Sequence, residues 1–193
     1  GRPEAALGIL GSAQMARRYG LPCRGGGVLT NSKIPDHQAG TEKMMMLWPL
    51  LLGGVHYVLH AAGWADGGLT ASFEQMVLDA EMLEMFGRFF TGVLVDEGTL
   101  ALDVIARVGA GGHFLGEEHT RQRFKTEFYF PTLADTEAYE SWVKKGSKDA
   151  AARATERYKK LLATYQKPPI DPAIDEELRD FVARRKREIE ATL

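Results

Sequence analysis

Apolar residues recur at helical spacing in the first part of the chain. Residues 3–19 predict a helix, and Gly20 follows directly after its end, where glycine commonly stops a helix. A second helix is expected from Asp36, a residue type that caps helix N-termini, to about Leu52. Pro49 should end or kink this second helix early, because proline breaks the helical hydrogen-bond pattern.

The most regular helical pattern lies at residues 72–90. Ser72 and Gln75 have the spacing of a capping box, in which each side chain bonds the backbone of the other residue. Seven apolar side chains then fall on one face, which we expect to pack against the core. They are Phe73, Met76, Val77, Ala80, Leu83, Phe86 and Phe90. A shorter helix is expected over residues 99–108.

Two stretches between these helices read as strands. Residues 55–63 are rich in β-forming residues and bounded by glycines, and residues 21–27 read as a short strand that runs into a glycine loop. The alternation of helices and strands predicts an α/β fold with a parallel sheet. A further strand at residues 126–130 is possible. Residues 133–193 are charged and helical in pattern, with the linker "KPPIDP" at residues 167–172.

Composition narrows the class of protein. Hydrophobic residues make up 45% and charged residues 26% of the 193 positions, as in ordinary soluble globular proteins. The net charge of −2 offers no positive surface for nucleic acid or anionic membrane. Cys23 is the single cysteine, which excludes an internal disulfide and suits the reducing cytoplasm, where we expect the protein to reside.

One segment imitates a membrane span. Residues 44–65 contain no Asp, Glu, Lys or Arg and are long enough to cross a bilayer. A proline, a pair of glycines and two histidines within the segment argue against a lipid-facing helix. We interpret it as a helix, a tight turn and a buried strand, and expect no membrane contact.

Three consecutive glycines, Gly25, Gly26 and Gly27, precede a polar run at residues 30–33. Glycines lose much backbone entropy on folding, so a run of them needs a structural or functional reason. One explanation is a loop that requires unusual backbone angles. The other is a backbone that must lie close to a ligand.

Arg24 and His60 stand where the two predicted strands run into loops. In parallel α/β proteins, ligands bind at the carboxyl ends of strands, so both side chains could reach one site if the strands are neighbours. An arginine binds a carboxylate bidentately, and a histidine adds a hydrogen bond. The alternative is that Arg24 pairs with a structural acid and His60 is a hydrogen-bonded core residue.

Aromatic residues surround the same predicted strand ends. Tyr57, Trp64, Trp48 and Phe73 could form an aromatic cage, which is how proteins hold quaternary ammonium groups. At these spacings they could equally be plain core residues.

A histidine and glutamate cluster lies further along the chain. His113, Glu117, Glu118 and His119 invite a zinc interpretation, but their spacing matches neither a zincin helix nor a zinc finger. We therefore expect no metal site.

Three long blocks resemble the corrinoid-dependent trimethylamine methyltransferase family: "YGLPCRGGGVLTNSKIPDHQAGTEK", "HAAGWADGGLTASFEQMVLDAEML" and "GGHFLGEEHTRQRFKTEFYFP". The similarity continues through "PPIDPAIDEELRDFVARRK". The resemblance implies the C-terminal part of a (β/α) TIM-type barrel in residues 1–131, followed by a charged helical appendage in residues 132–193. A complete barrel of this type needs about 250 residues.

The resemblance also implies a function. The protein would move a methyl group from a methylated amine to the cobalt of a corrinoid held by a separate cognate protein, so the chain itself would bind no cofactor. The glycines would keep the barrel mouth open for the corrinoid. By itself this stretch of chain is expected to be inactive and to self-associate as a homo-oligomer, because an incomplete barrel leaves strand edges unpaired.

The family's trimethylamine-specific members carry pyrrolysine, which the resemblance aligns with Asn31. Because an ordinary residue stands at this position, the chain resembles the family branch without pyrrolysine, some of whose members demethylate quaternary amines such as glycine betaine. On this interpretation Arg24 and His60 bind the substrate carboxylate, and Gly25–Gly27, Tyr57 and Trp64 line the substrate site. Two alternatives stay open: a non-catalytic amine-binding module, and a helical interaction or assembly domain.

Overall fold

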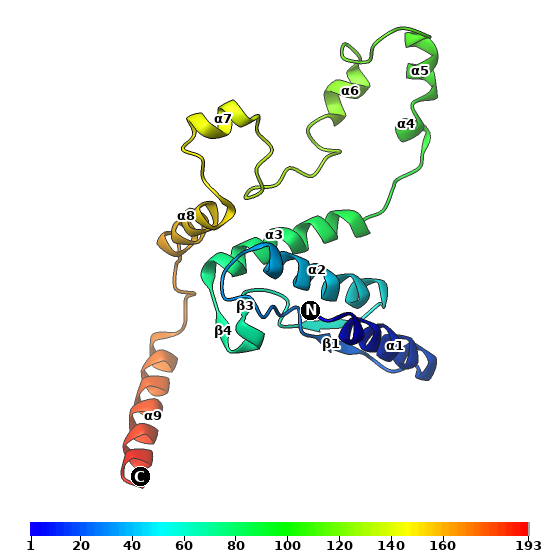
Figure 1. Cartoon of the computed structure of the whole chain (residues 1–193). Helices are drawn as coiled ribbons and strands as arrows, with labels where there is room; N and C mark the ends of the chain where they lie inside the picture. Colours follow the sequence, from blue (N-terminus) through cyan, green and yellow to red (C-terminus); the bar gives the residue numbers. More distant parts are fainter. Residues whose placement is uncertain (193) are drawn as a thin grey trace. The chain divides into compact units, whose positions relative to one another are not determined.

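Two short parallel strands, joined by a helix, lie in the N-terminal part of the chain beside its first two helices (Figure 1). The structure is a computed structural model and describes residues 1–192. Strand β1 (Arg24–Gly26) is followed by helix α2 (His37–Leu52) and strand β2 (Tyr57–Leu59). The two strands pair in parallel, with Arg24 opposite Tyr57 and Gly26 opposite Leu59. The predicted parallel arrangement is confirmed for these two strands, and they are neighbours, which the sequence left open; both are shorter than expected.

Helices α1 (Pro3–Tyr19) and α2 begin and end close to the predicted positions. Gly20 ends α1 with a φ of 66°, in the left-handed region that glycine adopts at helix ends. Asp36 caps α2, because its carboxylate accepts a hydrogen bond from the Ala39 amide. Pro49 does not end α2, which continues to Leu52.

The charge-free segment at residues 44–65 contains most of α2, a turn and β2, as its proline and glycines predicted. Across residues 1–192, the helices are all too short or too polar to serve as a bilayer span.

A small hairpin follows β2 and was not predicted. Strands β3 (Trp64–Ala65) and β4 (Thr70–Ala71) pair in antiparallel fashion around the 3-10 helix η1 (Asp66–Gly68). Each strand has two residues, which is too short for an alternating sequence pattern to be recognised.

Helix α3 (Phe73–Phe90) has the predicted bounds, but the face that it buries agrees with the predicted apolar stripe only in part, at Phe86 and the half-buried Leu83. Ser72 caps the helix by accepting a hydrogen bond from the Gln75 amide. The predicted capping box is wrong in its second half, because the Gln75 side chain bonds Asp79 instead. Gln75, Asp79, Glu81 and Phe86 are buried. Most of the predicted apolar stripe, including Phe73 at 60% exposure, faces solvent.

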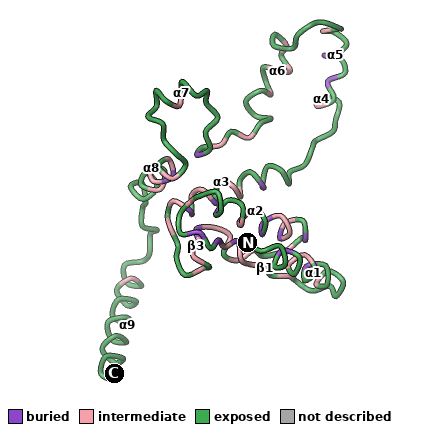
Figure 2. Tube along the Cα trace, in the orientation of Figure 1, coloured by how far each residue is buried: buried purple, intermediate pink, exposed green. Residues whose placement is uncertain are grey.

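The apolar core lies between α2, α3 and the strands (Figure 2). Val28, Leu47, Leu50 and Phe86 form its centre, each at most 5% exposed. Partly buried residues from α1, β2 and α3 pack around them. The core therefore holds the strand pair against α2 on one face of the sheet only.

A buried ion pair crosses this core between α2 and α3. Lys43 Nζ lies 2.7 Å from Asp79 Oδ2, and the two side chains are 0% and 3% exposed. Lys43 also donates to the Val28 carbonyl at 3.1 Å. Asp79 accepts hydrogen bonds from the Gly63 amide at 2.8 Å and from Gln75 Nε2 at 2.7 Å. The pair thus links two helices to the segments that follow β1 and β2.

The predicted helix at residues 99–108 is broken into α4 (Glu97–Leu100) and α5 (Leu102–Val108). Ala101 separates them with a φ of 49°, a left-handed conformation that interrupts helical hydrogen bonding. Helix α6 (Glu118–Arg123) follows. The possible strand at residues 126–130 is wrong: this segment forms turns and irregular backbone.

Helices α7 (Tyr139–Lys144) and α8 (Ala150–Ala163) follow a segment that is fastened to α3. The Glu81 carboxylate accepts hydrogen bonds from the backbone amides of Thr132, Leu133 and Ala134 at 2.5–2.8 Å. A buried acid on α3 therefore fixes this distant part of the chain.

The chain divides into two compact units, residues 1–159 and 160–193. The second unit contains helix α9 (Pro172–Glu190), capped by Asp171. The boundary predicted after residue 131 marks where the barrel segment would end and the helical appendage begin. It stays a prediction. Within residues 1–192 the structure has mixed helices with two small sheets, and its β1–α2–β2 unit is consistent with the predicted α/β class.

The buried ion pair gives a first prediction. Lys43→Met should lower the free energy of unfolding by about 3–5 kcal/mol, because it leaves the Asp79 carboxylate buried without its cation. The double variant Lys43→Met/Asp79→Leu should regain part of this loss, since it removes both charges. Urea denaturation followed by circular dichroism measures both.

Lys33→Met is the matched control. Its ion pair with Asp66 has side chains that are 71% and 35% exposed, so its loss should cost less than about 1 kcal/mol. A double variant that is no more stable than Lys43→Met would contradict the assignment of the loss to an unpaired buried charge.

Candidate functional site

The carboxyl ends of β1 and β2 carry the residues that the sequence singled out. His60 follows β2 directly, but Arg24 opens β1 and is level with Tyr57. The prediction that the two residues occupy equivalent positions is therefore wrong, because β1 begins later than the sequence pattern suggested.

The length of the arginine side chain compensates for this offset. Arg24 Cζ lies 3.8 Å from the position that a Cβ on Gly26 would occupy. Gly26 is level with Leu59, the residue before His60. The Arg24 guanidinium therefore extends along the strand to its carboxyl end. Among residues 1–192, no carboxylate pairs with it, which removes the structural-acid alternative for this part of the chain.

The three glycines have three different physical roles. A side chain on Gly25 would overlap Leu50 at 2.4 Å, so this glycine allows α2 to pack tightly on the sheet. Gly26 borders Arg24 and the Leu59 carbonyl on the opposite face. Gly27 has a φ of 98°, which side chains rarely permit. Unusual backbone angles therefore explain Gly27, and packing against Leu50 explains Gly25. Close approach of this backbone to a ligand stays a prediction.

Residues 27–34, here called the Asn31 loop, follow β1. Asn31 donates its amide to Glu42 Oε2 at 2.7 Å, and Thr30 donates its hydroxyl to the same oxygen at 2.8 Å. Lys33 Nζ donates to the Asn31 carbonyl at 2.8 Å. The Asn31 backbone is thus held on both sides, while its side chain remains exposed.

Residues 60–69, here called the His60 loop, contain strained backbone. His60 and Asp66 have φ values of 56° and 49°, in the left-handed region that costs side-chain-bearing residues energy. Such conformations persist where surrounding contacts enforce them, and they cluster at functional sites. The His60 and Trp64 rings meet edge to face, with centroids 5.2 Å apart.

The two loops are bonded to each other. Asp66 donates its amide to the Ser32 carbonyl at 3.0 Å, and Gly67 donates to the Thr30 carbonyl at 2.9 Å. Asp66 also forms the ion pair with Lys33 at 2.9 Å. Together the Asn31 loop and the His60 loop form one cross-linked rim at the carboxyl ends of the strands.

The predicted aromatic cage is only partly assembled. Tyr57 shares the face of Arg24 and is 60% exposed, and Trp64 contacts His60. Trp48 instead packs against Phe86, with centroids 4.6 Å apart, and Phe73 stacks on Tyr158. Including Trp48 and Phe73 was therefore wrong, because both serve helix packing.

The histidine and glutamate cluster is dispersed by other contacts. His119 Nε2 bonds the Gly98 carbonyl, while Glu117 pairs with Arg107 and Glu118 with Arg121. In residues 1–192 no group of three metal-ligating side chains comes together.

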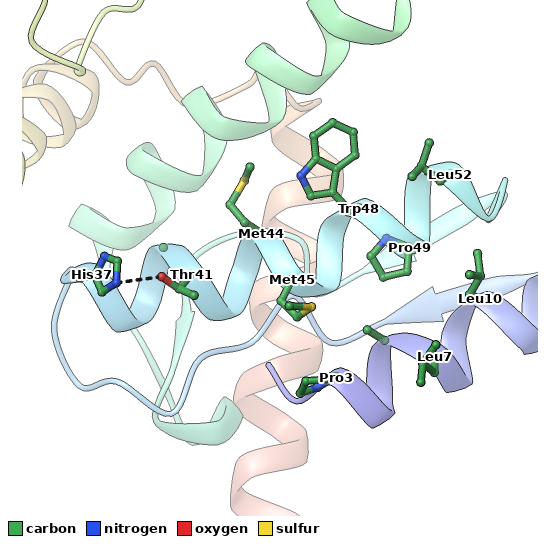
Figure 3. Close-up of a pocket in the computed structure, with 12 residues that line it drawn as sticks. Pro3, Leu7, Leu10, His37, Thr41, Met44, Met45, Trp48, Pro49 and Leu52 are labelled. Atoms are coloured by element: carbon green, nitrogen blue, oxygen red, sulfur yellow. Dashed lines mark hydrogen bonds between the residues drawn. The ribbon is translucent and has the colours of Figure 1, made fainter.

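A separate apolar groove of about 910 Å³ lies between α1 and α2 (Figure 3). Leu7 and Leu10 line it from α1, and Met45, Trp48 and Leu52 from α2. None of the strand-end residues lines it. The existence of this exposed apolar surface does not show whether the chain self-associates, so the expected self-association stays a prediction.

Sequence reasoning missed the acids and the lysine that hold the rim. Glu42, Lys43 and Asp79 read as ordinary helix-surface residues, because polar side chains in a helical pattern usually face water. One available signal was Lys43 itself, which stands directly before the apolar run "MMMLW" of α2.

The chain matches known proteins over nearly its whole length. The family model described as trimethylamine methyltransferase (MTTB) matches residues 1–190. A glycine betaine methyltransferase of Desulfitobacterium hafniense is 46% identical over 189 residues, which are 98% of this chain and 39% of that protein. A trimethylamine methyltransferase of Methanosarcina mazei is 36% identical over 97% of this chain and 37% of its own length. The chain thus spans less than two fifths of these relatives.

Glu42 gives a prediction for the dependence of stability on pH. Burial alone would raise the pKa of Glu42, but hydrogen bonds from Asn31, Thr30 and Gln38 outweigh it and lower the pKa below 4.5. A carboxyl group with a lowered folded-state pKa stabilises the fold above its unfolded pKa, and this contribution is lost as the pH falls through the folded pKa. The free energy of unfolding should therefore decrease as the pH is lowered below about 4.5.

The substitution Glu42→Gln should flatten this decline, as measured by urea denaturation between about pH 3 and pH 7. It should not abolish it, because the Ala39 amide also lowers the pKa of Asp36. Glu4→Gln, an exposed change on α1, is the control. An unaltered pH profile in Glu42→Gln would count against the assigned hydrogen bonds.

Proposed function

Because this chain belongs to the trimethylamine methyltransferase (MTTB) family, we propose that it takes part in demethylating a quaternary amine that carries a carboxylate, of the glycine betaine type. The activity belongs to the full-length gene product, since the matched relatives are more than twice as long as this chain. The observation that carries the choice of substrate is the Arg24 guanidinium, which no acid of residues 1–192 neutralises.

Arg24 is the group suited to the substrate carboxylate. Its guanidinium presents two parallel N–H donors, which match the two oxygens of a carboxylate. It lies beside Gly26, on the sheet face opposite the core, and so is open to a ligand. His60 stands at the same end of the strand pair and can supply a further donor. Trimethylamine has no carboxylate and would leave this arginine unused.

The cationic end of the substrate requires electron-rich surfaces. Tyr57 exposes its ring on the same face as Arg24, and Trp64 lies beside His60. Aromatic faces attract quaternary ammonium groups through the negative potential above the ring. Asn31 borders this region from the neighbouring loop, and its side chain is neutral.

The chemistry proposed is transfer of one methyl group. The bond between the methyl carbon and nitrogen breaks with its electron pair staying on nitrogen, and a tertiary amine leaves. A quaternary ammonium is activated for this step, because its leaving group is neutral. Asn31 stands where the resemblance places pyrrolysine in trimethylamine-specific relatives, which favours the quaternary substrate.

The methyl acceptor in this proposal is the cobalt of a corrinoid carried by a separate cytoplasmic protein. Residues of this chain contribute by binding and orienting the amine, so proximity and orientation supply much of the rate. The cross-linked rim is suited to such a role because its backbone is already fixed before the substrate binds.

A paired assay tests the substrate class. The full-length protein, supplied with a reduced corrinoid protein, should demethylate glycine betaine faster than trimethylamine. Methyl transfer is followed by the change in corrinoid absorbance. Faster turnover of trimethylamine would reverse the assignment. Binding of glycine betaine without any methyl transfer would favour a non-catalytic amine-binding module.

Arg24 gives a separate prediction. Arg24→Ala in the full-length protein should weaken glycine betaine binding by about 1.5–3 kcal/mol, the range for a lost charged hydrogen bond. Arg24→Lys should recover only part of this loss, because lysine keeps the charge without the bidentate geometry. Calorimetry measures both, with tetramethylammonium as a ligand without a carboxylate. Equal losses for the two ligands would exclude carboxylate recognition by Arg24.

A further inference from the structure

We propose that Glu42 is a positioning residue, which fixes the Asn31 loop to helix α2 and thereby places Asn31 beside the reacting end of the substrate. This proposal rests on the function proposed above. Glu42 is on the second turn of α2, and its carboxylate reaches across to the loop that follows β1. It does not contact the substrate face of Arg24 and Tyr57, so any effect on turnover must pass through the loop.

The two carboxylate oxygens of Glu42 have different partners. Oε2 accepts the Asn31 amide at 2.7 Å and the Thr30 hydroxyl at 2.8 Å. Oε1 accepts Gln38 Nε2 at 3.0 Å, a contact within α2. The Thr30 hydroxyl oxygen also accepts the Ser32 amide at 3.0 Å. One carboxylate oxygen therefore organises three consecutive residues of the loop, and the other does not touch the loop.

The opposite side of the loop is held by backbone hydrogen bonds from Asp66 and Gly67 to the Ser32 and Thr30 carbonyls, and at Asn31 itself by a single exposed lysine. Lys33 bridges the Asn31 carbonyl and Asp66, but its side chain is 71% exposed. Exposed ion pairs contribute little and are screened by salt. Hydrogen bonds to a partly buried carboxylate are stronger than neutral ones. Glu42 is thus the α2 side chain that bonds the Asn31 amide itself, while Lys43 of the same helix holds the start of the loop at the Val28 carbonyl.

The loop position decides where the Asn31 side chain lies. Asn31 Oδ1 is 3.2 Å from the position that a Cβ on Gly67 would occupy, so the amide packs against the glycine-lined His60 loop. Release of the Asn31 amide from Glu42 would let this side chain move relative to His60 and Trp64. A displacement of about 1 Å near reacting atoms can cost up to about a hundredfold in rate.

Backbone hydrogen exchange in the full-length protein tests the anchoring without requiring activity. Glu42→Ala should raise exchange in residues 28–34 by about tenfold, the equivalent of one lost charged hydrogen bond. Exchange in residues 73–90 of α3 reports on global stability and should change much less. Gln38→Ala is the matched control: it removes a bond to the same carboxylate but none to the loop, so exchange should be unchanged.

Steady-state kinetics with glycine betaine then test positioning. Glu42→Ala should lower kcat by about tenfold and leave KM within about twofold, because Arg24 still holds the carboxylate. Glu42→Gln keeps one acceptor for the Asn31 amide and should restore part of kcat. Gln38→Ala should match the wild type.

The possible outcomes separate this proposal from the proposed function. Faster exchange in residues 28–34 together with a lower kcat supports it. Unchanged exchange, or faster exchange with normal kcat, overturns it even if the wild type is active. A wild type that binds glycine betaine but transfers no methyl group overturns the proposed function, and the exchange result alone then judges whether Glu42 fixes the loop.

Discussion

The ion pair between Lys43 and Asp79 is the constraint on which the site depends. Two charges removed from water cost several kcal/mol each, and only near-complete hydrogen bonding offsets that cost. Here the Val28 carbonyl, the Gly63 amide and Gln75 supply the remaining partners. Val28 belongs to the Asn31 loop and Gly63 to the His60 loop. The same interaction that joins α2 to α3 therefore also fixes the distance between the two loops.

The same buried contacts explain why strained backbone persists in the His60 loop. His60 and Asp66 adopt left-handed backbone conformations that side chains disfavour, so each would relax if the loops were free. They are not free, because Asp79 holds the Gly63 amide and the Asn31 loop accepts the amides of Asp66 and Gly67. Contacts with the buried core and between the two loops thus hold His60 and Asp66 in backbone conformations that these residues would not adopt by local preference.

How far the sequence predicted this structure follows from the range of each interaction. The ends of α1 and α2 and the caps at Asp36 and Ser72 depend on local signals, and all were predicted. The parallel arrangement of β1 and β2 was predicted instead from the alternation of helices and strands along the chain. The buried face of α3 depends on Asp79 meeting Lys43, a partner 36 residues away, and the face predicted from helical periodicity shares only Phe86 with it. The offset of Arg24 and the anchoring by Glu42 had the same origin: strand register and loop contacts arise only after folding.

Recognition by Arg24 further depends on how the surrounding surface is enclosed. On an exposed face an arginine and a carboxylate gain roughly 0–1 kcal/mol, because water screens the pair and solvates both groups. In a site that excludes water the same bidentate contact is several times stronger. Arg24 and Tyr57 are exposed in residues 1–192, so strong carboxylate binding requires a cover over this sheet face. Under the proposed function that cover must still admit the methyl acceptor. Fixed loops at the strand ends meet both demands, since they hold the amine in place while one side stays open.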